Sequence, residues 1–397
     1  MASKIFGEYK QIIEDLYGKD TFRTPFESKS DLKNSINYRC NKYIKYFESL
    51  NKSGELINYI KSNIEVLQKA RHALDKSIEY YLVGKPRDAY QELAKLLDSS
   101  FYKKIIEILL INIDKYSHVK GFENQGRPHT SLYRAIVSDR GINKIGEMFH
   151  IPFQKRYLVN NQRFSIAGVP CLYLSTSIYD CWQEMGKPDL NKLYISRLKC
   201  RSNDTQYNVL DISYSIEREY EYTKKLNSIF DDEPAEETLR AKLIFWPVVM
   251  ACSYQKKYPE GNFHSEYIIP HLLLQWIRSN KEHIVGIKYR STNENKTNNS
   301  HIGDNFVFPT EPKLKKNGYC DFLSNIFEIS TPISWQLINT IDMNYIKSYS
   351  TSKSHNIFRF SNNNIEDNFS SQYSMTQFYK VEEILQQIPT NQINNND

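Results

Sequence analysis

The sequence lacks the features that would direct this chain to a membrane, a zinc site or an oxidising compartment. Its longest apolar run, Leu243 to Cys252, is too short to span a bilayer and contains Pro247. The N-terminal residues MASKIFGEYK lack the apolar core of a signal peptide. The six cysteines are scattered singly, without the paired spacing of a zinc or redox motif. We therefore expect a cytoplasmic protein with reduced thiols and no membrane partner.

The sequence also lacks a strong excess of charge of either sign. Its 397 residues carry a formal net charge of +6, and 25% of them are charged while 40% are hydrophobic. This is an ordinary globular balance. It permits an anionic ligand, but the clustered basic stripe typical of nucleic-acid-binding proteins is missing, so nucleic acid is not an expected partner.

Histidine spacing does not predict a metal site. His264 and His271 are separated by a spacing that can place both side chains on one helix face. No third or fourth ligand accompanies them at useful spacing, so capping and surface roles are expected instead. We predict no metal site and no resident cofactor.

The front of the chain is predicted to be helical, and its end largely flexible. Residues 1–122 form the expected all-α domain, because apolar residues recur at helical spacing in Ile57 to Leu82, Arg87 to Asp98 and Ile105 to Ile113. The cluster Gly121 to Pro128 is typical of a linker. Residues 346–397 are a Ser/Asn-rich tail, expected to be mostly flexible with one short helix around Val381 to Gln387.

Residues 129–345 are predicted to form a second domain that mixes strands and helices. Strand-like runs are Leu132 to Val137, Arg156 to Phe164, Val169 to Ser175, His283 to Tyr289 and Asn305 to Phe308. Helical patterns are Ile178 to Met185, Ala235 to Tyr254 and Glu266 to Ser279. The elements do not alternate regularly, which favours an α+β fold over a doubly wound α/β fold.

One stretch of this domain, from Phe149 to Gly186, suggests chemistry. Ser177 is a good N-cap for the helix that carries Glu184. Tyr173 lies on the preceding strand, and Arg163 would reach the same side if the intervening turn pairs the two strands. Arginine binds pyrophosphate oxygens, tyrosine stacks on a planar ring, and a carboxylate stabilises an oxocarbenium-like charge. Taken singly, each of the three residues is more often structural.

The same stretch resembles the RES-domain family of toxins and defence proteins. Six pieces follow the family order over about 180 residues. They are Leu132-Tyr133-Arg134-Ala135, then Arg163-Phe164-Ser165 through Gly168 and Pro170 to Tyr173, then Trp182-Gln183-Glu184, then Glu266-Tyr267 with Pro270, then Gly286-Ile287 with Tyr289 and Ser291, and finally Asn305 to Pro309. The helical front portion is also similar, though less specifically, to domains that precede such cores.

The resemblance implies an ADP-ribosyltransferase-like catalytic domain that degrades NAD by phosphorolysis or hydrolysis, with NAD as substrate and inorganic phosphate as co-substrate in the first case. Arg134 and Arg163 would bind the phosphates, and Glu184 would be the principal catalytic carboxylate. Tyr173 would pack against nicotinamide or its ribose. The rest of the expected substrate-binding set is Phe164, Ser291 and Glu266, the last bracing the cleft. A long region between Glu184 and Glu266 and a long polar loop after Ser291 depart from the family pattern.

Our leading hypothesis from the sequence is an NAD-consuming toxin or antiphage defence effector. Such an activity would arrest the cell, so we expect restraint by an antitoxin or another regulatory partner; the sequence leaves self-association open. Two alternatives stay open. An ADP-ribosyltransferase acting on a macromolecule would use nearly the same site, and a non-enzymatic nucleotide sensor would bind NAD without releasing nicotinamide.

Overall fold

The computed structural model describes residues 4–24, 26–28, 31–113, 131–201, 206–225, 234–280, 284–292, 303–337 and 373–393. The chain groups into two compact units, each discontinuous in sequence. Unit 1 draws on residues 1–112, 159–169 and 208–292, and unit 2 on residues 113–158, 170–207 and 293–397. The expected linker Gly121 to Pro128 and tail residues 346–372 lie outside the described residues. Helices and strands are mixed, so the α+β prediction is confirmed.

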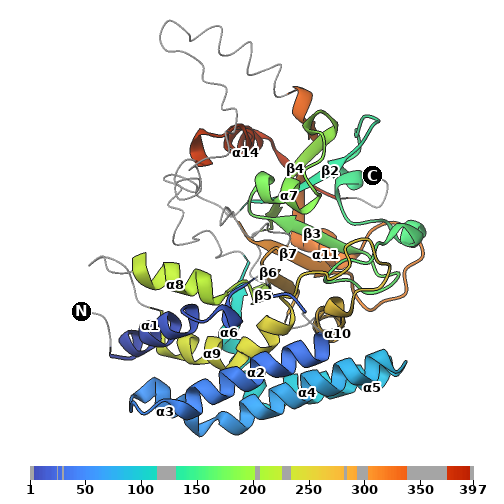
Figure 1. Ribbon diagram of the computed structural model, residues 1–397. Helices are drawn as coiled ribbons and strands as arrows, with labels where there is room; N and C mark the ends of the chain where they lie inside the picture. Colours follow the sequence, from blue (N-terminus) through green and yellow to red (C-terminus); the bar gives the residue numbers. More distant parts are fainter. Residues whose placement is uncertain are drawn as a thin grey trace, which may run out of the picture. The chain divides into compact units, whose positions relative to one another are not determined.

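Unit 1 consists mainly of helices. Helix α4 packs against both α2 and α5, and these three lie alongside one another in Figure 1. The helices of the unit are α1 (Lys4–Tyr17), α2 (Leu32–Ser49), α3 (Glu55–Ser62), α4 (Ile64–Leu82), α5 (Pro86–Leu97), α6 (Ser100–Leu109), α8 (Ile216–Lys225), α9 (Glu236–Ala251) and α10 (Ile268–Ser279), with short 3-10 turns η1 (Asp20–Phe22) and η5 (Ser265–Tyr267).

Helix α9 supplies much of the core of unit 1. The apolar run seen in the sequence is its C-terminal part, and the helix continues through Pro247. The C-terminal part of this helix is apolar on all sides, and every residue from Leu243 to Ala251 is buried. The Trp246 ring stacks on Tyr43 with centroids 4.3 Å apart, while the Tyr43 hydroxyl donates to the Leu243 carbonyl at 2.9 Å. Aromatic stacking and a satisfied buried hydroxyl thus hold α2 to α9.

Local sequence signals set several helix ends in unit 1. The Asp31 side chain accepts a hydrogen bond from the Asn34 amide at the start of α2, and Pro86 stands in the first turn of α5. The single helix predicted for Ile57 to Leu82 is broken at Asn63, whose side-chain amide donates to the Tyr59 carbonyl at 2.8 Å. That side chain satisfies the end of α3, so α4 begins as a separate helix.

Unit 1 also holds three short strands, β1 (Leu110–Asn112), β5 (Asn208–Asp211) and β6 (Gly286–Tyr289). Strand β1 pairs with β5 in antiparallel orientation, and β5 pairs with β6 in parallel orientation. The helix predicted for Ile105 to Ile113 therefore ends at Leu109, because the next residues join a sheet instead. Tertiary pairing has overridden a short apolar pattern that suits either element.

Unit 2 is built around an antiparallel sheet. Strand β3 lies between β2 and β7, and β2 also pairs with β4, which continues to β8 and then β10. The short strand β9 pairs with β4 as well. The strands are β2 (Leu132–Val137), β3 (Cys171–Ser175), β4 (Leu193–Cys200), β7 (Asn305–Pro309), β8 (Phe327–Ser330), β9 (Ile333–Ser334) and β10 (Thr390–Gln392).

The helices of unit 2 include α7 (Ile178–Glu184), α11 (Asp321–Ile326) and α14 (Gln377–Gln387), with 3-10 turns η2 (Ile145–Met148), η3 (Phe153–Leu158), η4 (Leu190–Lys192) and η7 (Tyr373–Met375). Helices α7 and α14 share a hydrophobic cluster with β2 and β4; Figure 1 shows α14 in red beside this part of the unit. The helix predicted for Val381 to Gln387 is confirmed and is one turn longer at its start.

The strand predicted for Arg156 to Phe164 is wrong. The chain forms the 3-10 turn η3 and then a bend instead. The Ser165 hydroxyl donates to the Gln162 carbonyl at 2.9 Å and accepts from the Gln162 amide at 3.1 Å. A serine that bonds locally to the backbone offers an alternative to a strand ladder. Arg163 therefore lies in a closed loop and does not end a strand.

No helix within the described residues is long and apolar enough to cross a membrane.

Candidate functional site

Arg134 is a partly buried cation in the middle of strand β2. One of its terminal nitrogens donates to the Tyr173 carbonyl oxygen on the neighbouring strand β3 at 3.0 Å, while its Nε atom is buried and has no hydrogen-bond partner among the described residues. Burial lowers the pKa of this guanidinium to about 10, so it stays charged at neutral pH. No described carboxylate forms an ion pair with it. A buried charge is normally paired, so Arg134 has the properties of an anion-binding group.

The pairing of β2 with β3 brings Arg134 and Tyr173 together. The register places Tyr133 opposite Ser175, and β3 continues in register with β7, where Tyr173 lies opposite Val307. The Tyr173 side chain is partly exposed, unlike its neighbours on the strand. A guanidinium on one strand and a partly exposed tyrosine on the next are suited to a planar ligand that also carries phosphate.

Glu184 is the last residue of helix α7 and is held in place by strand β7. Its Oε1 atom accepts a hydrogen bond of 2.7 Å from the side-chain amide of Asn305. Asn305 is buried and begins β7 opposite Ser175, so the sheet fixes the position of this amide. At the other end of the helix, Ser177 accepts from the Asp180 amide at 3.0 Å, the N-cap expected from the sequence.

Cys181 lies on helix α7, one turn before Glu184, and the charges of both Arg134 and Glu184 affect its thiol. Its thiol donates to the Tyr133 carbonyl at 3.3 Å. Burial and the Asp180 charge raise the pKa of this thiol strongly, while Arg134 lowers it and Glu184 raises it further. Cys181 is therefore within electrostatic range of both Arg134 and Glu184, and it is a protonated thiol, unsuited to nucleophilic chemistry.

His150 lies close enough to Arg134 for the guanidinium charge to lower the pKa of its ring. Its Nδ1–H donates to the Ile151 carbonyl at 2.8 Å, and its Nε2 accepts from the Cys320 amide at 2.9 Å. This arrangement requires a neutral ring. Burial, together with the charges of Arg134 and Lys315, lowers the pKa of His150 to about 4.

We expect His150 to make unit 2 less stable in mild acid. The unfolded chain binds a proton at His150 near pH 6.5, whereas the folded chain does so only near pH 4, so stability falls as the pH drops through this window. The free energy of unfolding at pH 5 should be about 2 kcal/mol lower than at pH 7 from this group. Urea titrations at both pH values measure it. The variant His150→Gln should lose this part of the pH dependence, and an unchanged dependence would contradict the assignment.

Arg163 is engaged within unit 1. Its guanidinium donates to the Cys252 carbonyl at 3.1 Å and to the Thr292 hydroxyl, and it lies over the Tyr267 ring, 5.1 Å from the centroid. These contacts fix the loop that contains Ser165 against unit 1. Arg163 and Tyr173 belong to different units, and the catalytic role of Arg163 stays a prediction.

The other predicted substrate-binding residues of unit 1 have structural partners. Glu266 is buried and accepts hydrogen bonds from the Lys257 amide at 3.3 Å and the Ser28 hydroxyl at 3.5 Å. The Phe164 ring is buried and packs on Tyr289, with centroids 4.7 Å apart. Ser291 is buried just after β6. The hydrogen bonds of Glu266 hold the backbone at Lys257 and the side chain of Ser28. Its expected role in bracing the cleft stays a prediction, as do the expected ligand contacts of Phe164 and Ser291.

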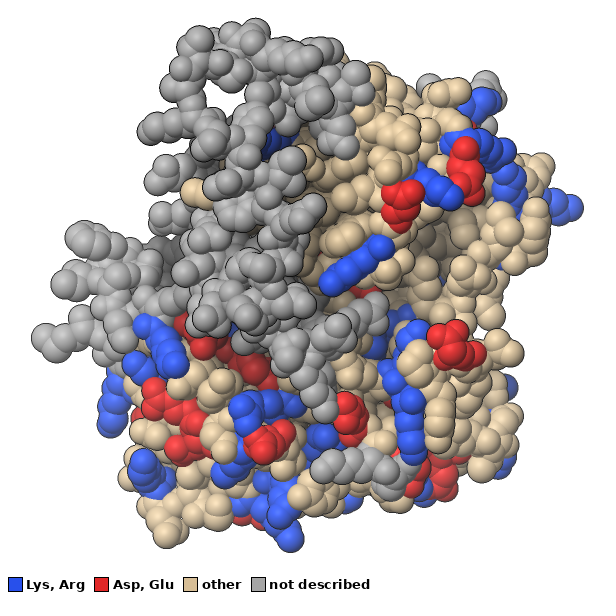
Figure 2. Space-filling model, turned by 45° about the horizontal axis from the view of Figure 1, so that its top comes forward, with Lys and Arg blue, Asp and Glu red and all other residues tan. Residues whose placement is uncertain are grey.

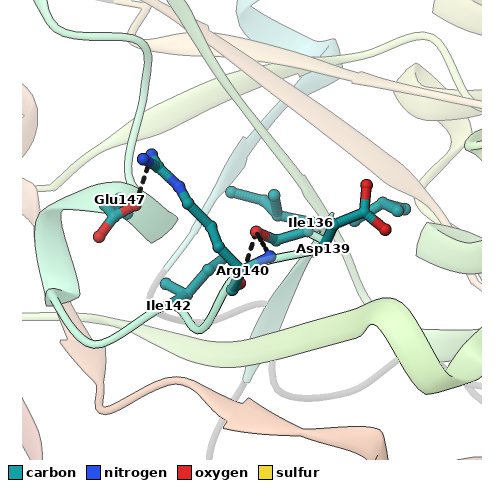
Figure 3. A pocket seen from close by; sticks show the side chains of 7 residues that line it. Ile136, Asp139, Arg140, Ile142 and Glu147 are labelled. Atoms are coloured by element: carbon teal, nitrogen blue, oxygen red, sulfur yellow. Dashed lines mark hydrogen bonds and ion pairs between the residues drawn. The ribbon is translucent and has the colours of Figure 1, made fainter.

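Unit 2 also has an open hollow of about 570 Å³ along residues 136–147. Figure 3 shows Arg140 reaching toward Glu147, and their side-chain atoms are 3.4 Å apart. Asp139, at the rim, is paired with Lys192 at 2.7 Å. Because the charges pair with one another and face solvent, this hollow does not offer the uncompensated charge found at Arg134.

Charged side chains of both signs are visible on the surface in Figure 2. On the face shown in Figure 2, lysines and arginines alternate with aspartates and glutamates over the charged part of the described surface. Nor does any group of three described histidine, cysteine, aspartate or glutamate side chains lie close enough to hold a metal ion. All six cysteines are free thiols.

No protein-family model matches this chain, and no solved structure matches it either. A curated protein does match. The chain is 32% identical over 307 residues to the Bacillus subtilis (strain 168) protein described as "Putative toxin YopC". The alignment covers 75% of this chain but 65% of that protein, so the chain spans less than two thirds of the relative's length. By sequence, this chain is therefore similar to a protein described as a toxin.

Proposed function

We propose that this chain is a toxin-like enzyme that breaks the nicotinamide–ribose bond of NAD, with the chemistry carried by Arg134, Tyr173 and Glu184 of unit 2. The observation that supports this most is the partly buried Arg134 guanidinium, which lacks a described carboxylate partner and is held against Tyr173. Such a cation needs an anion, and a pyrophosphate matches its bidentate geometry.

The single oriented carboxylate suits this reaction. As the C–N bond breaks, its electron pair moves to the pyridinium ring, and nicotinamide leaves as a neutral molecule. The leaving group therefore needs no proton, in contrast to a sugar alcohol, which requires a general acid. One carboxylate is enough to stabilise the positive charge that develops on the ribose. We assign this role to Glu184, whose side chain is held by the hydrogen bond from Asn305.

The acceptor completes the reaction. Attack by inorganic phosphate on the ribose carbon would give ADP-ribose 1″-phosphate, and attack by water would give ADP-ribose and a proton. The resemblance to the RES-domain family includes both outcomes. Loss of NAD would harm the producing cell, in keeping with a toxin-like role, and implies restraint by an antitoxin or another regulatory partner.

Replacing Arg134 with Lys tests the phosphate-binding role. Lysine keeps the charge but loses the planar fork that grips two phosphate oxygens. We expect the KM for NAD to rise about tenfold, with a smaller change in kcat, because the lost contact serves binding in both ground and transition states. Steady-state assays of nicotinamide release measure both constants.

The matched control for this variant is Arg140→Lys. Arg140 is in the same unit, is exposed, and is paired with Glu147. It should leave both constants unchanged. If Arg134→Lys has a KM within twofold of the wild type, Arg134 does not bind the substrate and the proposal loses its main support.

A further inference from the structure

Unit 1 contains a pocket of about 310 Å³ that the proposed reaction does not use. It lies between the C-terminal end of α4, the loop of residues 159–168 and the N-terminal end of α10. Gly168 adopts a positive φ of 70° in the turn between Ile166 and Val169, and this turn forms one wall. The volume is at the lower end of the range for small-molecule sites.

The side chains of Tyr81 and Phe263 line one side of the pocket. The Tyr81 and Phe263 rings are nearly parallel, with an interplanar angle of 14° and centroids 6.4 Å apart. Phe263 is 56% exposed, an unusual state for a large apolar ring. An accessible aromatic ring favours a planar ligand that can stack on it.

A histidine with little exposed surface, His264, lines the pocket wall. His264 is only 7% exposed, yet none of the described residues forms a hydrogen bond with its ring nitrogens. The ring packs edge-on to Tyr267, at 5.0 Å between centroids, and lines the pocket. The ring nitrogens of His264 make no hydrogen bond within the described residues and lie on the pocket wall, so they are available to a polar ligand atom there.

A second histidine of the pocket has a defined tautomer. His271 Nε2 is 2.8 Å from the Gln162 carbonyl oxygen, which can only accept, so Nε2 carries the proton. The Ser165 hydroxyl is 3.3 Å from the same nitrogen and donates to the same carbonyl. His271 therefore cannot act as a base toward Ser165, and the pair is not a nucleophilic site. Its Nδ1 is left as an acceptor.

The pocket is electrically neutral. No Asp, Glu, Lys or Arg is among the described residues that line it. Burial lowers the pKa of both His264 and His271. The Lys256 and Arg163 charges also lower it at His264, against Glu266, and the Arg163 charge lowers it at His271, against the hydrogen bond to Gln162, so the neutral form of both rings is favoured at pH 7. A neutral pocket does not favour phosphate, and its polar groups offer both donors and acceptors.

From these features we propose that the unit 1 pocket binds a neutral, planar nitrogen heterocycle of the nucleobase class, stacked on Phe263 and hydrogen-bonded to His264. The volume fits a nucleoside or a free base, and a whole dinucleotide would exceed it. This site is formed by unit 1 residues and is independent of the NAD cleavage proposed for unit 2. Adenosine and free nicotinamide represent two sources of such a ring.

Calorimetric titration of the full chain with adenosine and, separately, with nicotinamide tests the proposal. Ribose 5-phosphate, which has no ring to stack, is the control probe and should not bind the pocket. At least one heterocycle should bind the wild type, and Phe263→Ala should weaken that binding about tenfold, as expected for loss of a stacking surface. His264→Gln should weaken it as well. Tyr258→Ala, which removes another ring of this unit that is 68% exposed, should have no effect.

The controls separate this pocket from the proposed active site. Phe263→Ala should retain NAD cleavage, and Glu184→Gln should retain binding of the heterocycle. If neither heterocycle binds the wild type, or if binding survives both Phe263→Ala and His264→Gln, the pocket is not such a site. Binding of nicotinamide that is lost in Glu184→Gln and kept in Phe263→Ala would also overturn the proposal, because it would place that ligand in unit 2.

Discussion

Glu184→Gln is expected to lower the rate of nicotinamide release from NAD by at least about 100-fold, the range seen when a group that stabilises transition-state charge is removed. The amide oxygen of the new glutamine can still accept the hydrogen bond from Asn305, so the side chain should keep its position. What disappears is the negative charge beside the developing oxocarbenium ion. The loss should therefore be in kcat, with a modest change in KM.

A matched carboxylate serves as the control. Glu147→Gln removes a charge from the surface of the same unit, where Glu147 is paired with Arg140. It should leave kcat unchanged. The conservative change Glu184→Asp should retain part of kcat, because it keeps the negative charge on a shorter side chain. Near-normal kcat in Glu184→Gln would exclude Glu184 as the catalytic carboxylate.

Glu382→Ala is expected to lower the free energy of unfolding of unit 2 by about 3 kcal/mol. Glu382 lies on α14 and is fully buried, with 0% of its surface exposed. Its Oε1 atom accepts hydrogen bonds from the Ile178 amide at 2.8 Å and from the Tyr373 hydroxyl at 2.6 Å. Alanine would leave both buried donors unsatisfied and would remove a negative charge from the N-terminus of α7.

Urea unfolding of the variant and of two controls measures this effect. Glu383→Ala changes the next residue, which is exposed, and should cost little. Glu382→Gln keeps an acceptor oxygen and should be intermediate. Because α7 carries Glu184, Glu382→Ala should also reduce NAD cleavage. A stability within about 1 kcal/mol of the wild type would mean that the C-terminal helix does not hold α7 in place.

Much of the secondary structure could be predicted because it depends on local signals. Ser177 caps α7 and Pro86 begins α5, as expected from their chemistry. Helices α9 and α10 and strands β2, β3 and β7 follow from apolar patterns within single segments. Errors occurred where a side chain bonded to nearby backbone, as at Asn63 and Ser165.

The grouping of the chain into units could not be predicted in the same way. Residues 208–292 fold with the N-terminal helices, and the Tyr43 contacts with Leu243 and Trp246 join segments about 200 positions apart. Periodicity describes one segment at a time and carries no information about which segments meet. The linear division into 1–122, 129–345 and 346–397 stays a prediction about sequence organisation.

The positions of the candidate site residues in the fold could be predicted in part, while their roles stay predictions. Arg134 and Tyr173 are neighbours in the structure, and Glu184 lies at the end of the expected helix. The partners that orient this helix, Asn305 and Glu382, were not assigned these roles from the sequence, although Asn305 stands in one of the resembling pieces. An asparagine beginning a buried strand was the available signal. For Glu382 the signal was a single charge on the apolar side of a short helix.

The most direct test of the account is nicotinamide release from NAD by the purified chain, measured with and without inorganic phosphate beside Glu184→Gln. We predict release by the wild type in at least one condition and its loss in the variant. Release that needs phosphate would identify a phosphorylase, and release without phosphate a hydrolase. An absence of NAD binding and of nicotinamide release in both conditions would contradict the proposed function.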